Sequence, residues 1–175
     1  MKNVKNIVLI GFMGVGKTTI GKRIAQKLNI DFYDTDEAIR RCEKMPVHEL
    51  LRKKGEKYFE GAQRFAVSTL AQHEGVLIST GGDTVMDEFN LSELKKNGIL
   101  FWLKGSPETV YKNTRYSLAK RPDLAKASLT EISKMMESRE PFYEKADHII
   151  PVDQGSMDDT ADAIIRTFQT LTEKG

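Results

Sequence analysis

The sequence predicts a three-layer α/β/α fold, with helices on both faces of a five-stranded parallel sheet. Short apolar runs of strand length alternate with longer segments of helical periodicity along the chain. Parallel strands need crossover connections of about a dozen residues or more, and the helical segments supply them. The first apolar run, residues 7–10, reads IVLI and is apolar on both faces, as expected for a buried central strand.

Five strands and six helices are expected in this order. The strands are expected at residues 6–10, 31–34, 76–79, 99–103 and 148–152. The helices are expected at residues 18–28, 37–53, 56–72, 107–113, 129–145 and 157–171. No low-hydrophobicity linker and no internal repeat divides the chain, so residues 1–175 are expected to form a single domain.

Composition excludes several classes of protein. Lys and Arg number 27 and Asp and Glu 25, a net charge of +2 that is too balanced for a dedicated nucleic-acid surface. The single cysteine, Cys42, permits neither an internal disulfide nor a cysteine-only metal site. No stretch approaches the ~18–20 apolar residues of a membrane span. The apolar run at residues 7–10 is shorter than the roughly 7–15 residues of a signal-peptide core. We expect a cytoplasmic monomer with no nucleic-acid or membrane partner.

A glycine-rich segment follows the first strand directly. Residues 11–18 read GFMGVGKT, which fits the pattern G-x-x-x-x-G-K-[ST], and an amphipathic helical pattern begins at its end. Glycines let successive backbone N–H groups face an anion, and the N-terminus of the following helix adds partial positive charge. The lysine can reach the β- and γ-phosphates, and the threonine hydroxyl can ligate Mg²⁺. The segment therefore predicts a site for ATP and Mg²⁺ at Gly14, Val15, Gly16, Lys17, Thr18 and Thr19.

The polar and basic segment at residues 115–126, RYSLAKRPDLAK, has two interpretations. Its Pro122 interrupts any helix, and a charge-rich segment is commonly a solvated surface loop. In a protein with a phosphate site it can instead be a mobile lid that closes over a charged ligand. We expect a lid at about residues 113–126, closing over the phosphate-binding loop (P-loop) of residues 11–18.

The P-loop alone does not name a function, because switches, motors and metabolic kinases share it. A guanine-reading N-K-x-D motif would mark a GTPase, but its nearest match, Asn97-Gly98, lacks the lysine and the aspartate. A chain of 175 residues suits a small-molecule kinase better than a motor. No long lid insertion is present, which disfavours an adenylate-type kinase.

Two acidic residues follow the second predicted strand. Alternation along a strand would put Asp34 and Asp36 on the same side, about 7 Å apart, at the sheet edge where ligands bind. One carboxylate could hold Mg²⁺ or its water while the other accepts a proton from a hydroxyl. The alternative for either residue is an N-cap of the following helix. The next strand ends in Gly81-Gly82, where the backbone can approach a ligand closely.

Taken together, these motifs resemble the shikimate kinase family across nearly the whole chain. The resemblance is carried by NIVLIGFMGVGKTTIG at residues 6–21, DTD at 34–36, KGEKYF at 54–59, the glycine pair, Arg121-Pro122 and the R-x-P-x-Y of residues 139–143. The family transfers the γ-phosphoryl group of ATP to the 3-hydroxyl of shikimate in aromatic amino-acid biosynthesis.

The resemblance implies a role for each matching residue. Lys17 and Thr18 would hold the phosphates and Mg²⁺, and Asp34 would hold the metal through water. Asp36 would orient and deprotonate the acceptor hydroxyl. Arg121, on the lid, would stabilise charge on the γ-phosphoryl group, and Arg139 would bind the acceptor carboxylate. The adenine-side arginine of the family corresponds to Arg115, and Gly81 and Gly82 would contact the acceptor.

Three positions depart from the family pattern, which has GE-x-x-F-R-x-x-E and a third glycine after the glycine pair. Here the arginine is Glu60, the second glutamate is Gln63 and the third glycine is Asp83. The charge changes are −2, +1 and −1, a net −2, and shikimate is an anion. A charge-assisted arginine–carboxylate contact contributes roughly 1.5–3 kcal/mol, so the change opposes shikimate binding. Arg64 could pair with Glu60 or reach inward instead, and Asp83 could turn away to cap the next segment.

Three functions remain open from the sequence. The first is a shikimate kinase that transfers phosphate from ATP to shikimate. The second is a related kinase with a neutral or cationic acceptor, suited to Glu60, Gln63 and Asp83 as binding residues. The third is a nucleotide-binding paralogue without turnover, although the phosphoryl-transfer residues are all present. We expect a shikimate kinase because Arg121 and Arg139 are retained.

Overall fold

The fold is a five-stranded parallel sheet covered by helices, as the sequence predicts. It is known from a computed structural model that describes residues 4–115 and 122–173. The strands are β1 (Asn6–Ile10), β2 (Phe32–Asp34), β3 (Leu77–Ser79), β4 (Gly98–Lys104) and β5 (His148–Pro151). Their order in the sheet is β2-β3-β1-β4-β5, and each neighbouring pair is parallel. β1 is therefore the central strand.

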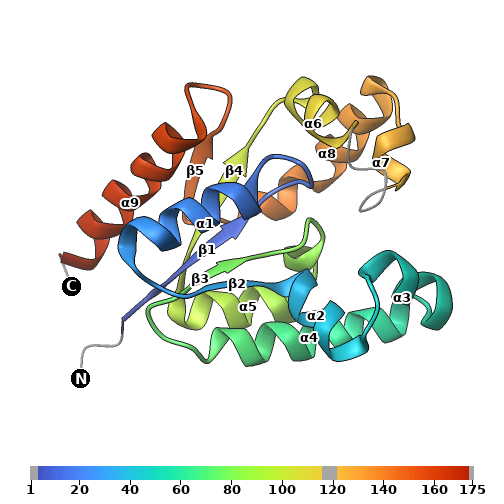
Figure 1. The fold of residues 1–175 in the computed structure, drawn as a ribbon, viewed down its shortest axis with the longest axis horizontal. Coiled ribbons are helices and arrows are strands. Elements are labelled where there is room, and N and C mark those ends of the chain that lie inside the picture. The colour runs from blue at the N-terminus through green and yellow to red at the C-terminus, as the bar shows by residue number, and fades with distance from the viewer. Residues whose placement is uncertain (1–3, 116–121, 174–175) are drawn as a thin grey trace.

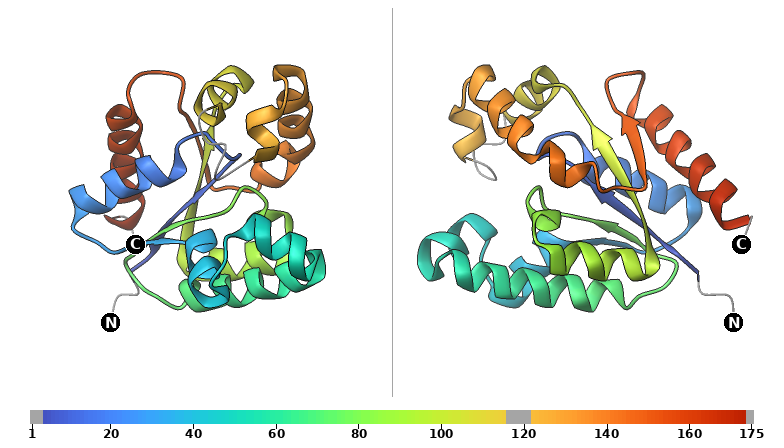
Figure 2. Two further views of the ribbon diagram at one scale, coloured as in Figure 1. Left: turned by 45° about the vertical axis from the view of Figure 1, so that its right-hand side comes forward. Right: turned by 180° about the vertical axis from the view of Figure 1, so that it is seen from behind.

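Helices cover both faces of this sheet. They are α1 (Lys17–Leu28), α2 (Thr35–Glu43), α3 (Val47–Lys54), α4 (Glu56–Ala71), α5 (Glu88–Asn97), α6 (Pro107–Thr114), α7 (Pro122–Lys126), α8 (Leu129–Tyr143) and α9 (Met157–Glu173), with a 3₁₀ turn η1 (Thr84–Met86). α1 and α9 lie on one face, and α4, α5 and α8 lie on the other (Figures 1 and 2). In the part of the chain that the structure describes, no helix is both long enough and apolar enough to cross a membrane.

Three helical segments differ from the expectation. The single helix expected at residues 37–53 is two helices, α2 and α3. Lys44 ends α2 in the left-handed region, with φ of 57°, and Pro46 caps α3. α5 was not expected, because it buries only a short face. α7 lies within the expected lid and begins at Pro122, a position where proline is compatible with a helix.

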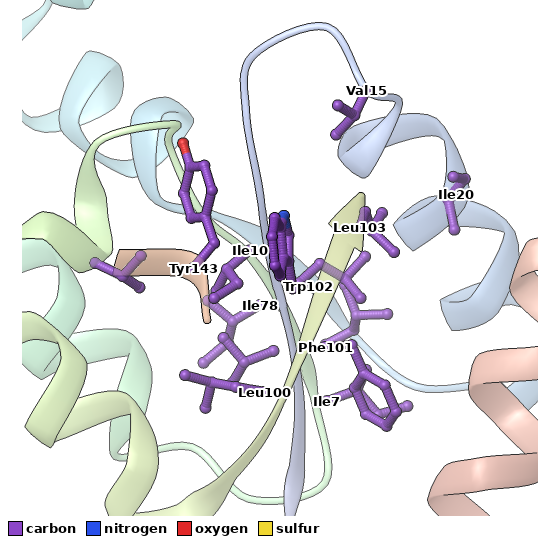
Figure 3. Close-up of a cluster of buried hydrophobic side chains, with 14 of the residues drawn as sticks. Ile7, Ile10, Val15, Ile20, Ile78, Leu100, Phe101, Trp102, Leu103 and Tyr143 are labelled. Atoms are coloured by element: carbon purple, nitrogen blue, oxygen red, sulfur yellow. The ribbon is translucent and has the colours of Figure 1, made fainter. Parts of the chain in front are cut away.

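The core lies where β1 and β4 meet the helices. Every residue of β1 is buried, and Trp102 of β4 is 4% exposed, so this tryptophan belongs to the core. Figure 3 shows it beside Tyr143 of α8, with ring centroids 5.8 Å apart. Because β1 is fixed on both sides, the segment that leaves its carboxyl end has a fixed starting point. The carboxyl ends of β1, β2 and β3 lie at the same edge, opposite the end at which β1 begins (Figure 1).

Two glycines inside helices differ in the space around them, and this difference gives a matched pair of variants. A Cβ on Gly21 of α1 would lie 2.8 Å from Phe32 Cε2 and 3.0 Å from Leu77 Cδ2, whereas a Cβ on Gly61 of α4 has no described atom within 4 Å. We expect Gly21→Ala to lower the free energy of unfolding by about 1–2 kcal/mol through overpacking. Gly61→Ala should raise it by about 0.5–1 kcal/mol through helix propensity. Urea unfolding measures both, and two changes of the same sign would contradict the close packing of α1 on the sheet.

Candidate active site

The loop between β1 and α1 has the backbone of an anion site. Gly11, Gly14 and Gly16 have φ of 143°, 83° and 105°, backbone conformations that residues other than glycine rarely adopt. Gly16 is the N-cap of α1, and no side chain of the described residues caps this helix. Its first N–H groups therefore remain available, together with the positive end of the helix dipole, for a phosphate group.

Lys17 is held across this loop rather than extended into solvent. Its Nζ donates to the carbonyl oxygens of Gly11 at 2.7 Å and Phe12 at 2.8 Å, and the residue is 8% exposed. These bonds satisfy a buried ammonium group and hold it beside the N-terminus of α1. The position fits a lysine that binds the phosphates of a nucleotide. Thr19, by contrast, is exposed in the first turn of α1.

Asp34 has two functions in the structure, one at each carboxylate oxygen. Its Oδ1 accepts a hydrogen bond from the backbone N–H of Glu37 at 3.0 Å, so it is the N-cap of α2. Its Oδ2 lies 3.4 Å from Thr18 Oγ1, which donates to it. The N-cap and the metal-site interpretations of this residue are therefore compatible. Thr18 and Asp34 together present the oxygen ligands that Mg²⁺ prefers.

Asp36 lies in the first turn of α2, so the expected strand alternation from Asp34 to Asp36 is wrong. The strand ends at Asp34 because its side chain caps the helix there. The Oδ1 of Asp36 is nevertheless buried against the loop after β3, 2.5 Å from the position of a Cβ on Gly81. The N–H of Gly81 donates to Thr35 Oγ1 at 2.9 Å and fixes this approach.

Arg139 of α8 reaches the same loop from the other side. Its Nη1 lies 3.3 Å from the position of a Cβ on Gly82, and its guanidinium carbon lies 5.1 Å from the centroid of the Phe12 ring. Nη1 is buried and makes no hydrogen bond to any residue that the structure describes. A buried cationic donor without a partner is costly unless a ligand satisfies it. The geometry fits an arginine that binds an anionic acceptor.

Tyr143 of α8 contacts the glycine pair, Gly81-Gly82, through its hydroxyl group. Its hydroxyl donates to the carbonyl oxygen of Gly82, and burial raises the pKa of this tyrosine to about 12, although nearby Arg139 lowers it. The hydroxyl therefore stays protonated, and remains a donor, across the neutral range. In Figure 3 it points toward the loop after β3.

Two residues that differ from the family pattern, and the neighbouring Arg64, form contacts that the sequence did not predict. Arg64 neither pairs with Glu60 nor reaches inward: it binds Asp87, with Nε 2.6 Å from Oδ2 and Nη2 3.2 Å from Oδ1. Asp83 makes no side-chain cap bond to the following turn, so the capping interpretation is wrong. Instead its Oδ1 accepts from Nε2 of the buried Gln63 at 3.2 Å. Glu60 is exposed on α4.

The end of α6 docks on the P-loop. Asn113 Nδ2 donates to the carbonyl oxygen of Gly14 at 2.7 Å, and a Cβ on Gly14 would lie 2.6 Å from Thr114 Cγ2. Arg115 follows directly, with its guanidinium carbon 3.7 Å from the centroid of the Tyr111 ring. Arg121 and the lid segment 116–121 lie outside the described residues.

Three residues that position the site were not predicted as site residues. Thr35 and Tyr143 fix the glycine pair, and Asn113 fixes the P-loop. A signal existed for Tyr143, because it follows Arg139 by four residues and the two therefore share a helix face. No comparable signal marks Asn113.

The fold and the site define a P-loop phosphotransferase that acts on a small molecule. A phosphate loop, an oxygen pair suited to Mg²⁺, and a carboxylate and a guanidinium that face two adjacent glycines meet at one edge of a parallel sheet. Residues 13–169 match the family model described as shikimate kinase. The chain belongs to the shikimate kinase family, which confirms the resemblance and the kinase fold expected from the sequence.

Full-length relatives and solved structures agree with this assignment. The chain is 39% identical to a shikimate kinase of Caldanaerobacter subterraneus subsp. tengcongensis, over 96% of this chain and 98% of the relative. It is 41% identical to one of Caldicellulosiruptor saccharolyticus, over 98% and 99%. A crystal structure of shikimate kinase from Bacteroides thetaiotaomicron is similar with a TM-score of 0.84 and 31% identity, covering 97% of this chain and 98% of that one. A shikimate kinase from Acinetobacter baumannii, solved in complex with shikimate, is similar with a TM-score of 0.88 and 28% identity, covering 97% and 95%.

The raised pKa of Tyr143 predicts a loss of stability in alkali. The ordinary tyrosine pKa of 10.0 applies to the unfolded chain, and the folded value is about 12. The protonated Tyr143 hydroxyl therefore stabilises the folded protein, and this contribution to the free energy of unfolding is complete below pH 10.0. It is lost as the pH rises through about 12, and it totals roughly 2–3 kcal/mol. Tyr143→Phe lacks this titration. We expect the difference in unfolding free energy between the two proteins to shrink above pH 10.0 in urea titrations, and a constant difference would contradict the burial argument.

Proposed function

We propose that the protein transfers the γ-phosphoryl group of ATP to the 3-hydroxyl of shikimate, using the residues assembled around Gly81 and Gly82. The observation that carries this proposal is that Asp36 and Arg139 face adjacent glycines of one loop. A carboxylate suited to accept a proton and a guanidinium suited to bind a carboxylate therefore lie at two ends of one acceptor pocket. Shikimate offers both a hydroxyl and a carboxylate.

The nucleotide half of the site would hold ATP by its phosphates. The backbone N–H groups of Gly14, Val15 and Gly16 and the first turn of α1, with Thr18 and Thr19, would donate to phosphate oxygens. Lys17 would exchange its carbonyl partners for the β- and γ-phosphates. Arg115, at the end of α6, would contact the adenine side, as the resemblance implies.

Mg²⁺ fits the pair formed by Thr18 and Asp34, whose oxygens already lie 3.4 Å apart. Thr18 Oγ1 would coordinate the ion directly, and Asp34 Oδ2 would hold one of its waters. When bound, Mg²⁺ neutralises charge on the β- and γ-phosphate oxygens. Asp34 stays in place because its other oxygen caps α2.

Asp36 would accept the proton of the acceptor hydroxyl during transfer. The acceptor oxygen forms a bond to the γ-phosphorus, the bond from that phosphorus to the β–γ bridging oxygen breaks, and ADP leaves. Lys17 stabilises the charge that develops on the transferred group. Arg121 would add to this stabilisation from the lid, an assignment that rests on the family resemblance alone.

The acceptor half retains its interior charge despite the departures from the family pattern. The family glutamate is Gln63 here and the family glycine is Asp83, so one change removes a carboxylate and the other adds one. The two side chains form a hydrogen bond of 3.2 Å with each other, so the charge lost at residue 63 and the charge gained at residue 83 cancel at one place. The remaining change is the replacement of an arginine by the exposed Glu60. Together with the family assignment, this favours shikimate over a neutral or cationic acceptor.

A single domain, a monomeric state and a cytoplasmic location remain predictions from the sequence. The family assignment argues against a nucleotide-binding paralogue without turnover, and the residues for phosphoryl transfer that the structure describes are in place.

Asp36→Asn tests the proposed base. We expect kcat for shikimate-dependent ADP release to fall by about a hundredfold or more, because an amide cannot accept the proton. ATP affinity by calorimetry should stay within about twofold, since Asp36 Oδ1 lies against Gly81 in the loop after β3. The control is Asp31→Asn, an exposed aspartate before β2. An unchanged kcat in Asp36→Asn would remove this residue from the role of base.

Glu60→Arg tests the one departure from the family pattern that changes charge at an exposed position. Replacing an anion with a cation should lower the shikimate KM by about threefold or more, with kcat little changed. The same substitution at exposed Glu74, which follows α4 at the opposite edge of the sheet, controls for net charge. Equal KM values in the wild type and in Glu60→Arg would show that residue 60 does not act on the acceptor.

A further inference from the structure

A half-open cavity of about 240 Å³ lies between the end of β4 and α8. Neither Asp36 of α2 nor Gly81 of the loop after β3 lines it. Its apolar walls include the side chains of Phe12, Val15, Trp102, Leu103, Met136 and Tyr143, so the P-loop residue Val15 borders it. Trp102 and Tyr143 form one continuous aromatic wall, with ring centroids 5.8 Å apart (Figure 3).

The size and lining of this cavity suit one ring with a short side chain. A dry apolar cavity of about 150 Å³ is large enough for benzene, so the larger volume here leaves room for two or three further atoms. Small-molecule sites in proteins combine an apolar lining with few polar groups that fix orientation. The polar groups here lie at the mouth, on α8 and at the end of β4.

Charge at the mouth favours a cationic group. Three charged residues line the cavity, Lys104, Glu137 and Glu140, and they sum to −1. Lys104 and Glu140 form an ion pair with each other, and the Lys104 ammonium also lies 4.7 Å from the centroid of the Trp102 ring. Glu137 accepts from Ser133 Oγ at 3.4 Å and forms no ion pair with any described residue. It is therefore the acidic group left for a ligand.

Two walls of the cavity also contact the acceptor site. The Phe12 ring lies against the guanidinium of Arg139, at 5.1 Å, and the Tyr143 hydroxyl donates to the carbonyl oxygen of Gly82. A ligand that packs against these rings contacts the side chains that position Arg139 and Gly82. Occupancy of the cavity then changes the affinity for the acceptor, and binding of the acceptor changes the affinity of the cavity for its ligand by the same factor.

We propose that this cavity is a binding site for a small arylalkyl ammonium compound, with the ring between Phe12, Met136 and Trp102 and the ammonium group at Glu137, and that its occupancy alters acceptor affinity. The second part rests on the proposed function, because it is measured with shikimate. The first part is independent of catalysis.

Calorimetry with phenethylamine tests binding directly. We compare it with 2-phenylethanol, which is neutral, and 3-phenylpropanoate, which is anionic. Phenethylamine should bind with the highest affinity and the carboxylate with the lowest. Glu137→Gln should lower the affinity for phenethylamine about threefold, as expected for the loss of an exposed ion pair, and leave the affinity for 2-phenylethanol unchanged.

Filling the cavity gives a second test. Met136→Trp should abolish phenethylamine binding, whereas Ser138→Trp, on an exposed position of the same helix, should not. Glu137→Gln remains informative even if Met136→Trp fails to fold, because Glu137 is exposed. The proposal is overturned if wild type binds no phenethylamine up to about 10 mM, if the three probes bind equally, or if Ser138→Trp loses binding as Met136→Trp does.

Kinetics test the coupling. Saturating phenethylamine should change the shikimate KM at least twofold in the wild type and have no effect in Met136→Trp. A protein without shikimate turnover would fail here and still show the calorimetric signal, so the two proposals fail separately. An unchanged KM with phenethylamine bound would overturn the coupling.

Discussion

The approach of the Gly81 backbone to the Asp36 carboxylate is the contact on which the site geometry depends. A Cβ at Gly81 would lie 2.5 Å from Asp36 Oδ1, so any side chain at this position would displace the Asp36 carboxylate from its place against the loop after β3. The hydrogen bond from Gly81 N to Thr35 Oγ1 fixes that distance. At Gly82, a Cβ would lie 3.2 Å from Met13 N of the P-loop and 3.3 Å from Arg139 Nη1. Two adjacent glycines therefore let the P-loop, α2 and α8 meet.

The electrostatics of the pocket follow from this close packing. Arg139 presents a buried donor that no described residue satisfies, and Tyr143 stays protonated because it is buried. Asp83 is held by Gln63 in a buried network that also includes Asn90, whose Nδ2 donates to Gln63 Oε1 at 3.1 Å. Gln63 therefore bonds one oxygen of the Asp83 carboxylate, while Arg139 Nη1 has no hydrogen-bond partner among the described residues.

Local patterns predicted the parts of the fold and site that are local in sequence. The strand, glycine loop and helix at residues 6–28 follow from apolar runs and glycine spacing, and the structure has them there. The division of α2 from α3 was missed because Lys44 adopts a left-handed conformation that lysine rarely takes. The two functions of Asp34 were seen as alternatives, because the sequence cannot show that each carboxylate oxygen has its own partner. The contacts of Gln63 with Asp83 and of Asn113 with Gly14 join segments distant in sequence, so no local pattern predicts them.

The central claim is that Arg139 gives the acceptor pocket a preference for an anion despite nearby Asp36 and Asp83. The most direct measurement is the KM for shikimate and for its uncharged methyl ester, in a coupled ADP-release assay with ATP and Mg²⁺. The account predicts turnover with shikimate and a KM for the ester that is about tenfold higher or more, because the ester loses a charge-assisted contact. An ester KM equal to or below that of shikimate would contradict it.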